Sequence, residues 1–214
     1  MRPLQALAIR EHKIYLQELP ALSRQPVELF VDMEGVPDKG FYYLIGVLVC
    51  QGDTTEHYSF WADTEQDEHH IWQQFVDTVM QYPDAPIYHY GSYEPRAIAT
   101  LAKRYETDGA LLTKRLVNVN RYIYGKVYFP VRSNGLKAIG TFIGAKWTSP
   151  YASGLQSIVW RHHWEKTQHA PYRDVLVIYN AEDCSALKVL LDALSKIALS
   201  AAIPAEPPSP VIIG

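Results

Sequence analysis

Two carboxylates that lie two residues apart are the first feature of the sequence that could do chemistry. Asp32 and Glu34 follow the apolar run 29–31, which predicts a buried strand over about 27–34. Successive side chains of a strand point to opposite faces, so these two acids should project to the same side and repel each other. A hard divalent cation with oxygen ligands, Mg²⁺ or Mn²⁺, would offset that repulsion. The alternative is a strand end that turns into solvent, where acidic residues are common.

Three further residues could complete a metal site. Glu94 begins an expected helix just after a short expected strand, and ligands of open α/β sheets bind where strands end. Asp183 follows Tyr179 by four residues on a later helix, so both lie on one helical face. An Asp on the apolar side of a helix is costly to bury unless it is paired or binds a metal. The alternative for both acids is a carboxylate in a first helical turn, stabilised by the helix dipole.

The elements that must position these residues form an α/β domain with a mixed sheet. Three hairpin-linked strands come first, followed by a helix, a fourth strand and further helices. Strands are expected at 8–15, 27–34, 41–50, 56–61 and 85–90, and helices at 71–79, 93–105, 109–117, 134–144 and 175–199. The sequence of residues 118–133 is compatible with either a loop or a strand.

The composition is that of an ordinary soluble globular protein, with 48% hydrophobic and 20% charged residues. The length of 214 residues fits one domain of the larger kind. No apolar run approaches the roughly 20 residues that span a bilayer, and charges interrupt the short apolar segment at the start, unlike a signal peptide. Cys50 and Cys184 form neither a disulfide framework nor a zinc signature. We therefore expect a cytoplasmic protein without a membrane segment.

The net charge of −3 conceals two stretches of opposite sign. Residues 28–94 contain 13 acidic residues and one basic residue, whereas residues 96–146 contain ten basic and two acidic ones. The first stretch could hold metal and the second a polyanion, although both could also be solvated surfaces. Candidates for contact with nucleic-acid phosphates are Arg96, Lys103, Arg104, Lys114, Arg115, Arg121 and Lys137, and candidates for stacking on unpaired bases are Tyr88, Tyr90 and Tyr93.

Four short motifs together resemble a known family. They are Asp-Met-Glu-Gly-Val-Pro-Asp from residue 32, Tyr-Tyr-Leu-Ile-Gly-Val from 42, His-Tyr-Gly-Ser-Tyr-Glu from 89 and Tyr-Asn-Ala-Glu-Asp-Cys from 179. The chain resembles the tyrosine-containing DEDD (DEDDy) exonucleases of the ribonuclease H-like superfamily. Within them it is most similar to the predicted domain that forms the C-terminal half of certain RecB-like nucleases. The resemblance covers roughly residues 5–200. It implies a mixed five-stranded sheet, three antiparallel strands followed by parallel strands, flanked by helices.

This resemblance also implies 3′→5′ hydrolysis of phosphodiester bonds at single-stranded nucleic-acid ends, with DNA favoured over RNA. Two ions, Mg²⁺ or Mn²⁺, would take part. Asp32 would bridge both ions, Glu34 and Asp183 would complete the site of one, and Glu94 would serve the other. Tyr179 would orient the attacking water, because a phenol stays protonated at neutral pH. A role in DNA repair or defence is the matching expectation.

Two features depart from the family pattern. Most members carry Asp where Glu94 stands, and the RecB-like nuclease half is not among these 214 residues. A second function therefore stays open, a catalytically silent module that binds nucleic acid, a partner nuclease or a helicase. An endonuclease of the ribonuclease H or integrase kind is a third. We expect an N-terminal extension at 1–26, the exonuclease domain at 27–200 and a flexible Pro-rich tail at 201–214.

Overall fold

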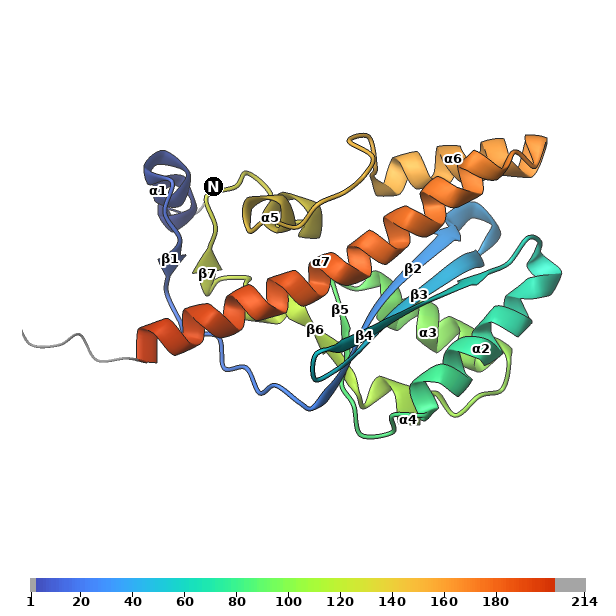
Figure 1. Ribbon diagram of the computed structural model, residues 1–214, viewed down its shortest axis with the longest axis horizontal. Coiled ribbons are helices and arrows are strands. Elements are labelled where there is room, and N and C mark those ends of the chain that lie inside the picture. Colours follow the sequence, from blue (N-terminus) through green and yellow to red (C-terminus); the bar gives the residue numbers. More distant parts are fainter. Residues whose placement is uncertain (1–2, 203–214) are drawn as a thin grey trace, which may run out of the picture.

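A five-stranded mixed sheet forms the centre of the fold (Figure 1). The computed structural model describes residues 3–202, with side chains to residue 199. Along the sheet the strands are β4 (Thr54–Trp61), β3 (Phe41–Gln51), β2 (Val27–Val36), β5 (Ile87–His89) and β6 (Leu116–Asn118). Strand β3 runs antiparallel to both β2 and β4, whereas β5 pairs with β2, and β6 with β5, in parallel. The expected sheet of three antiparallel strands followed by parallel strands is confirmed.

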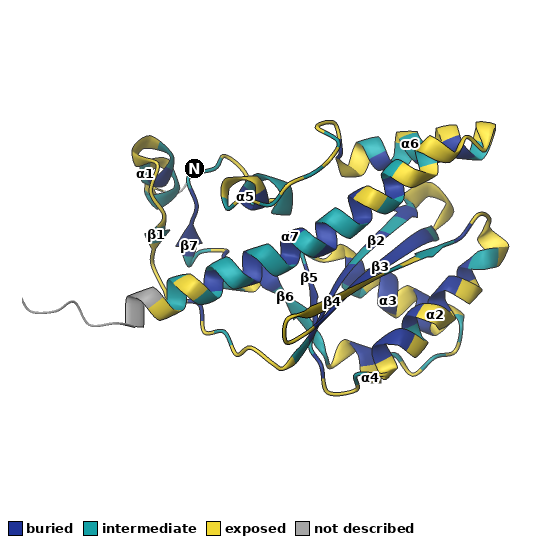
Figure 2. Cartoon of the chain, in the orientation of Figure 1, coloured by how far each residue is buried: buried dark blue, intermediate teal, exposed yellow. Residues whose placement is uncertain are grey.

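Alternation along β2 sends its side chains into two separate cores. Leu29, Val31 and Met33 belong to the first core, and Phe30 belongs to the second. Because one core lies on each face of the sheet, β2 and β3 are buried along most of their length (Figure 2). Because residues two apart share a face of a strand, Asp32 and Glu34 lie on the same face of β2 as Phe30, the face of the second core.

Helices cover both faces of the sheet (Figure 1). Helices α2 (Glu68–Met80) and α3 (Tyr93–Arg104) pack into the first core, and the long helix α7 (Ala170–Ala202) packs across β2 and β3 in the second. At 1.5 Å per residue, α7 is about 50 Å long. Helices α5 (Leu136–Phe142) and α6 (Gly154–Thr167) contact α7, and α4 (Gly109–Thr113) contacts α3. The Phe30 face of β2 therefore meets α7, which brings distant parts of the chain to the two acids.

The N-terminal region differs from the expectation. The strand predicted at 8–15 is wrong, because α1 (Pro3–Glu11) is a helix there. Pro3 is favoured at a first helical position, and the segment that follows is rich in Ala, Leu, Gln and Arg, which have high helix propensity. Strand β1 (Tyr15–Leu16) then pairs with β7 (Val127–Tyr128), so the open segment 118–133 contains a short strand.

Two other elements were not expected. The predicted helix at 109–117 ends at Thr113, and the next residues form the short strand β6. Helix α6 has no apolar stripe, because its buried residues are Ser157, Arg161 and Trp164 while Leu155 is 81% exposed. Hydrophobic periodicity cannot reveal a helix whose buried face is polar.

The polar face of α6 is stabilised by a buried arginine. The guanidinium of Arg161 donates hydrogen bonds to the carbonyls of Ala62 (2.9 Å) and Asp63 (2.6 Å). It also lies 4.6–5.2 Å from the centroids of four aromatic rings, those of Phe41, Tyr43, Trp61 and Trp164. These contacts hold α6 beside the end of β4.

No helix within residues 3–202 is long and apolar enough to cross a membrane. Of the tail predicted at 201–214, residues 203–214 lie outside the described residues.

Candidate active site

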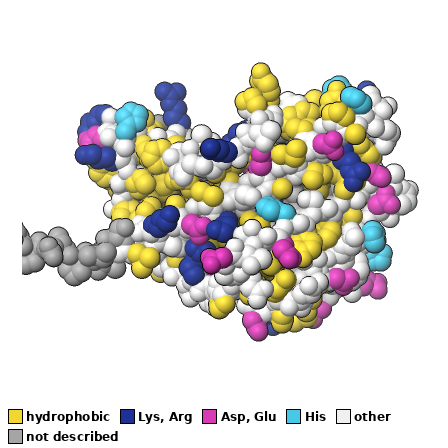
Figure 3. Space-filling model, viewed as in Figure 1, with side chains coloured by type: hydrophobic (Ala, Val, Ile, Leu, Met, Phe, Trp, Pro, Cys, Tyr) yellow, Lys and Arg dark blue, Asp and Glu magenta, His cyan; other side chains and the backbone are white. Residues whose placement is uncertain are grey.

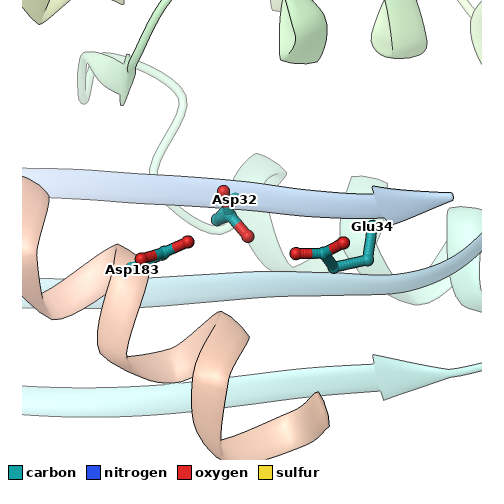
Figure 4. Close-up of side chains that lie close together, drawn as sticks. All are labelled: Asp32, Glu34 and Asp183. Carbon is teal, nitrogen blue, oxygen red and sulfur yellow. The ribbon is translucent and has the colours of Figure 1, made fainter. Parts of the chain in front are cut away.

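Three of the predicted acids meet between β2 and α7. Asp32 and Glu34 project from one face of β2 toward Asp183, which comes from α7 (Figure 4). One carboxylate oxygen of each lies within 4.8 Å of the other two. The two strand residues do not turn into solvent, because β2 continues to Val36, with an irregularity in its pairing after Glu34. Strand alternation and the packing of α7 thus produce a compact set of three acids.

No cationic side chain within residues 3–199 forms an ion pair with these acids, although the charge of Lys137 acts on Asp183 and offsets part of the rise in its pKa. No lysine, arginine or histidine nitrogen there lies within 4.0 Å of the three carboxylates. Burial and, secondarily, mutual repulsion raise the pKa of Glu34 to about 8. Burial likewise raises the pKa of Asp183 to about 6 and that of Asp32 well above its ordinary value. A bound divalent cation would remove the repulsion that makes these ionised groups costly.

Uncharged donors bind the three carboxylates instead. Each acid accepts one hydrogen bond of 2.7 Å, from Asn180 Nδ2 to Asp32 Oδ2, from Ser157 Oγ to Glu34 Oε2, and from Trp147 Nε1 to Asp183 Oδ1. Sequence reasoning missed all three donors. Ser157 lies on the unexpected helix α6, and Trp147 lies in the connection between α5 and α6. Asn180 directly follows Tyr179 in a quoted motif, which is the one signal that could have found it.

A glycine makes room for one of these donors. Gly46 of β3 lies opposite Asp32 in the strand pair, and Asn180 fills the space above it. A Cβ atom on Gly46 would lie only 1.9 Å from Asn180 Oδ1, so any other residue would force the Asn180 side chain to move. The close approach of β3 and α7 is therefore part of the site.

Tyr179 and Glu94 lie at the border of the three-acid group. Tyr179 is buried one helical turn before Asp183, and burial together with the nearby acids raises its pKa far above the usual range. Glu94 is buried at the start of α3 but lies outside the group of acids within 4.8 Å. Its Oε2 has no hydrogen-bond partner within residues 3–199 and lies 3.6 Å from His89 Nδ1. Its charge still raises the pKa of Asp32, so it faces the same region.

The candidates for nucleic-acid contact surround the site to different degrees. Tyr93 is 41% exposed, and its hydroxyl lies above Gly35 of β2. Arg96 is exposed one turn later on α3. Lys137 is half-buried, and its ammonium donates a hydrogen bond to the carbonyl of Ala152. Tyr93 and Lys137 therefore border the acids, and their contact with nucleic acid stays a prediction.

Several other candidates have structural roles. Tyr88 is buried and stacks on Phe30, with ring centroids 5.2 Å apart, so it is not available to a base. The Tyr90 hydroxyl donates to the backbone carbonyl of Asn134. Arg104 pairs with the buried Glu68. Arg115 donates hydrogen bonds to three backbone carbonyls near the end of α2, those of Val79, Tyr82 and Ala85.

The surface of the protein is uneven in charge. On the face shown in Figure 3, Lys and Arg side chains gather over the left half, while acidic side chains are more numerous toward the lower right.

One comparison with known proteins identifies a family. A family model described as the RNase H superfamily matches residues 29–195. The match begins in β2, ends in α7 and includes all five predicted catalytic residues. The mixed sheet agrees with an RNase H-like fold. No curated protein matches the chain significantly.

Proposed function

Because the chain belongs to the RNase H superfamily, we propose that it is a divalent-metal-dependent 3′→5′ exonuclease acting on single-stranded nucleic-acid ends, with DNA favoured. Membership supports a hydrolytic, nuclease-type function. The observation that carries the finer proposal is the set of three acids within 4.8 Å, without a cationic partner within residues 3–199. Buried acids that lack a partner and converge on one point are typical of a functional site.

The donor set fits Mg²⁺ or Mn²⁺, because it consists of carboxylate oxygens alone. Asp32 would contact two ions, Glu34 and Asp183 would hold the first, and Glu94 would hold the second. When bound, such ions supply an activated water and stabilise the leaving oxygen.

Other residues would handle the substrate. Tyr179 would orient the attacking water by a hydrogen bond, and its strongly raised pKa prevents it from acting as a base at neutral pH. The exposed ring of Tyr93 would stack on the terminal base, and Arg96 and Lys137 would contact phosphates.

The position of Glu94 favours a second candidate function. Because Glu94 lies outside the three-acid group and near His89, the second ion has a poorer ligand set than the first. A catalytically silent module that binds nucleic acid, a RecB-like nuclease or a helicase would need only the fold. Either function would suit DNA repair in the cytoplasm.

Digestion of a 5′-labelled single-stranded oligonucleotide with Mn²⁺ tests the proposal, with the Asp32→Ala variant as control. The expected result is a ladder shortened from the 3′ end that is absent in the variant. Cleavage of a closed single-stranded circle would indicate an endonuclease instead. Tight binding that is indifferent to EDTA, with no product in Mn²⁺, would indicate the silent module.

A further inference from the structure

We infer that Asn180, Ser157 and Trp147 are positioning residues that hold the three carboxylates ready for a divalent cation and thereby set its affinity. This inference rests on the proposed function, because it requires that Asp32, Glu34 and Asp183 bind metal. It concerns residues that would not touch the ion and act only through the acids.

The three donors reach the acids from separate segments of the chain. Asn180 is 0% exposed on α7, and its Nδ2 also donates to the backbone carbonyl of Asp32 at 3.0 Å. Ser157 is 1% exposed on α6. The Ser157 hydroxyl also lies 3.0 Å from the carbonyl of Gly154, so each of these donors has a backbone acceptor beside the carboxylate and is fixed in direction by both.

Trp147 is itself held in place by α7. The next residue, Thr148, donates hydrogen bonds from its backbone nitrogen (2.8 Å) and its hydroxyl (2.6 Å) to Glu182 Oε1. Glu182 directly precedes Asp183, which accepts the indole N–H of Trp147. Two adjacent residues of α7 therefore anchor the connection and receive its donor. The Lys137 ammonium of α5 lies 5.7 Å from the centroid of the Trp147 ring, so the indole is held between α5 and α7.

The chemistry of the donors suits preparation for a cation. An amide, a hydroxyl and an indole each bind one carboxylate oxygen and leave the negative charge of the acid in place. A lysine or arginine at the same positions would fix the carboxylates equally well but would also neutralise them. Hydrogen bonds to ligating carboxylates orient the ligands, and loss of one typically weakens metal affinity about 10- to 100-fold.

Titration of metal-free protein with Mn²⁺ tests the inference, with free Mn²⁺ followed by electron paramagnetic resonance. Ser157→Ala removes one hydroxyl, and Trp147→Phe removes the indole N–H but keeps an aromatic ring. Each should raise the Kd for Mn²⁺ about 10- to 100-fold, and Asn180→Ala should raise it at least as much. Should Asn180→Ala fail to fold, the other two variants decide the outcome.

Two matched controls separate positioning from general destabilisation. Ser195→Ala removes a hydroxyl that donates to the carbonyl of Leu191 (2.9 Å), and Trp72→Phe removes an indole hydrogen bond to Thr107 Oγ1 (2.9 Å) on the far side of the sheet. Both changes are expected to leave the Kd for Mn²⁺ unchanged. A merely structural role for Ser157 and Trp147 would lower the Tm of the metal-free protein and leave the Kd of the folded protein as it was.

The possible failures are distinguishable. An unchanged Kd in Ser157→Ala and Trp147→Phe, beside lost binding in Asp32→Ala, would overturn the positioning role and leave the metal site intact. Absence of Mn²⁺ binding by the unmodified protein would overturn the metal site, and with it both the inference and the proposed function.

Discussion

One face of β2 carries three acidic residues, and their partners divide the strand into two regions. Near its start, buried Glu28 accepts hydrogen bonds from the Arg24 guanidinium at 2.6 and 2.8 Å. Four and six residues later, Asp32 and Glu34 accept hydrogen bonds from an amide and a hydroxyl. At about 3.4 Å per residue, roughly 14 Å separates Glu28 from Asp32.

The difference shows how one strand can serve both stability and chemistry. The charge of Glu28 is neutralised within the chain, so this acid contributes to packing of the segment before β2. The carboxylates of Asp32 and Glu34 are oriented by their hydrogen bonds but not neutralised. Burial without a cation raises the pKa of both groups. A buried acid without its own cation lowers stability until a cation from solution arrives.

The largest contrast is expected in hydrolysis. Asp32→Ala should lower the rate at least about 1,000-fold, because the loss of a metal ligand removes several kcal/mol of transition-state stabilisation. Glu28→Gln on the same strand face should leave the rate unchanged, because Glu28 does not contact the site. Product formation from a labelled single strand measures both. Equal activity of the two variants would remove the functional distinction between the regions.

Metal binding should stabilise the protein through one region only. Mn²⁺ at 100 times its Kd should raise the free energy of unfolding by about 2.7 kcal/mol in the unmodified protein and in Glu28→Gln. Asp32→Ala should show no increase. Urea denaturation with Mn²⁺ and with EDTA gives these values. A full increase in Asp32→Ala would place the stabilising ion elsewhere.

Removal of the Glu28 charge should destabilise the protein. Glu28→Gln replaces a charged acceptor of the Arg24 guanidinium with a neutral one, which should lower the free energy of unfolding by about 2 kcal/mol. Urea denaturation in EDTA measures this change. Thr100→Ala, which removes an exposed hydroxyl on α3 that donates to the carbonyl of Arg96 (2.8 Å), serves as the control. A stability equal to that of the unmodified protein would mean that the ion pair is not structural.

A Glu-to-Gln substitution at Glu34, six residues later, should stabilise the metal-free protein instead of destabilising it. Glu34→Gln should raise the free energy of unfolding of the metal-free protein by about 3 kcal/mol at pH 7, because the protein no longer has to protonate this buried carboxylate when it folds. Burial raises the pKa of Glu34 from 4.5 to about 8, so folded protein binds more protons between these values and loses stability as pH rises.

The gain from Glu34→Gln should therefore vanish below about pH 4.5, grow as the pH rises and reach a plateau above about pH 8. Urea denaturation in EDTA across this range provides the measurement. A gain that does not depend on pH would show that the effect comes from packing and not from the charge.

The sequence predicted those parts of the site in which the residues belong to one strand or one helix. Alternation along β2 placed Asp32 and Glu34 on one side, and four-residue helical spacing placed Tyr179 with Asp183. The approach of α7 to β2 followed from the resemblance and not from periodicity. Glu94 was expected among the metal ligands, but the structure places it outside the group of three.

The donors could not be predicted, because their contacts join distant parts of the chain. Ser157 and Glu34 are 123 residues apart, and Asn180 and Asp32 are 148 apart. Helix α6 escaped detection for a related reason, since its buried Arg161 is stabilised by aromatic rings and carbonyls from other elements. A helix stabilised in this way does not show apolar residues at helical spacing, so hydrophobic periodicity does not detect it.

Gly46 extends the requirements of the site to a residue without any functional group. A methyl group there would force the Asn180 side chain to move, and Asn180 is the residue that donates a hydrogen bond to Asp32. All the acids could then be present in a sequence while Asp32 lacked the donor that orients it. When active and inactive relatives are sorted by sequence, position 46 should be read together with the carboxylates, because a side chain there would mark a site in which Asn180 cannot take this position.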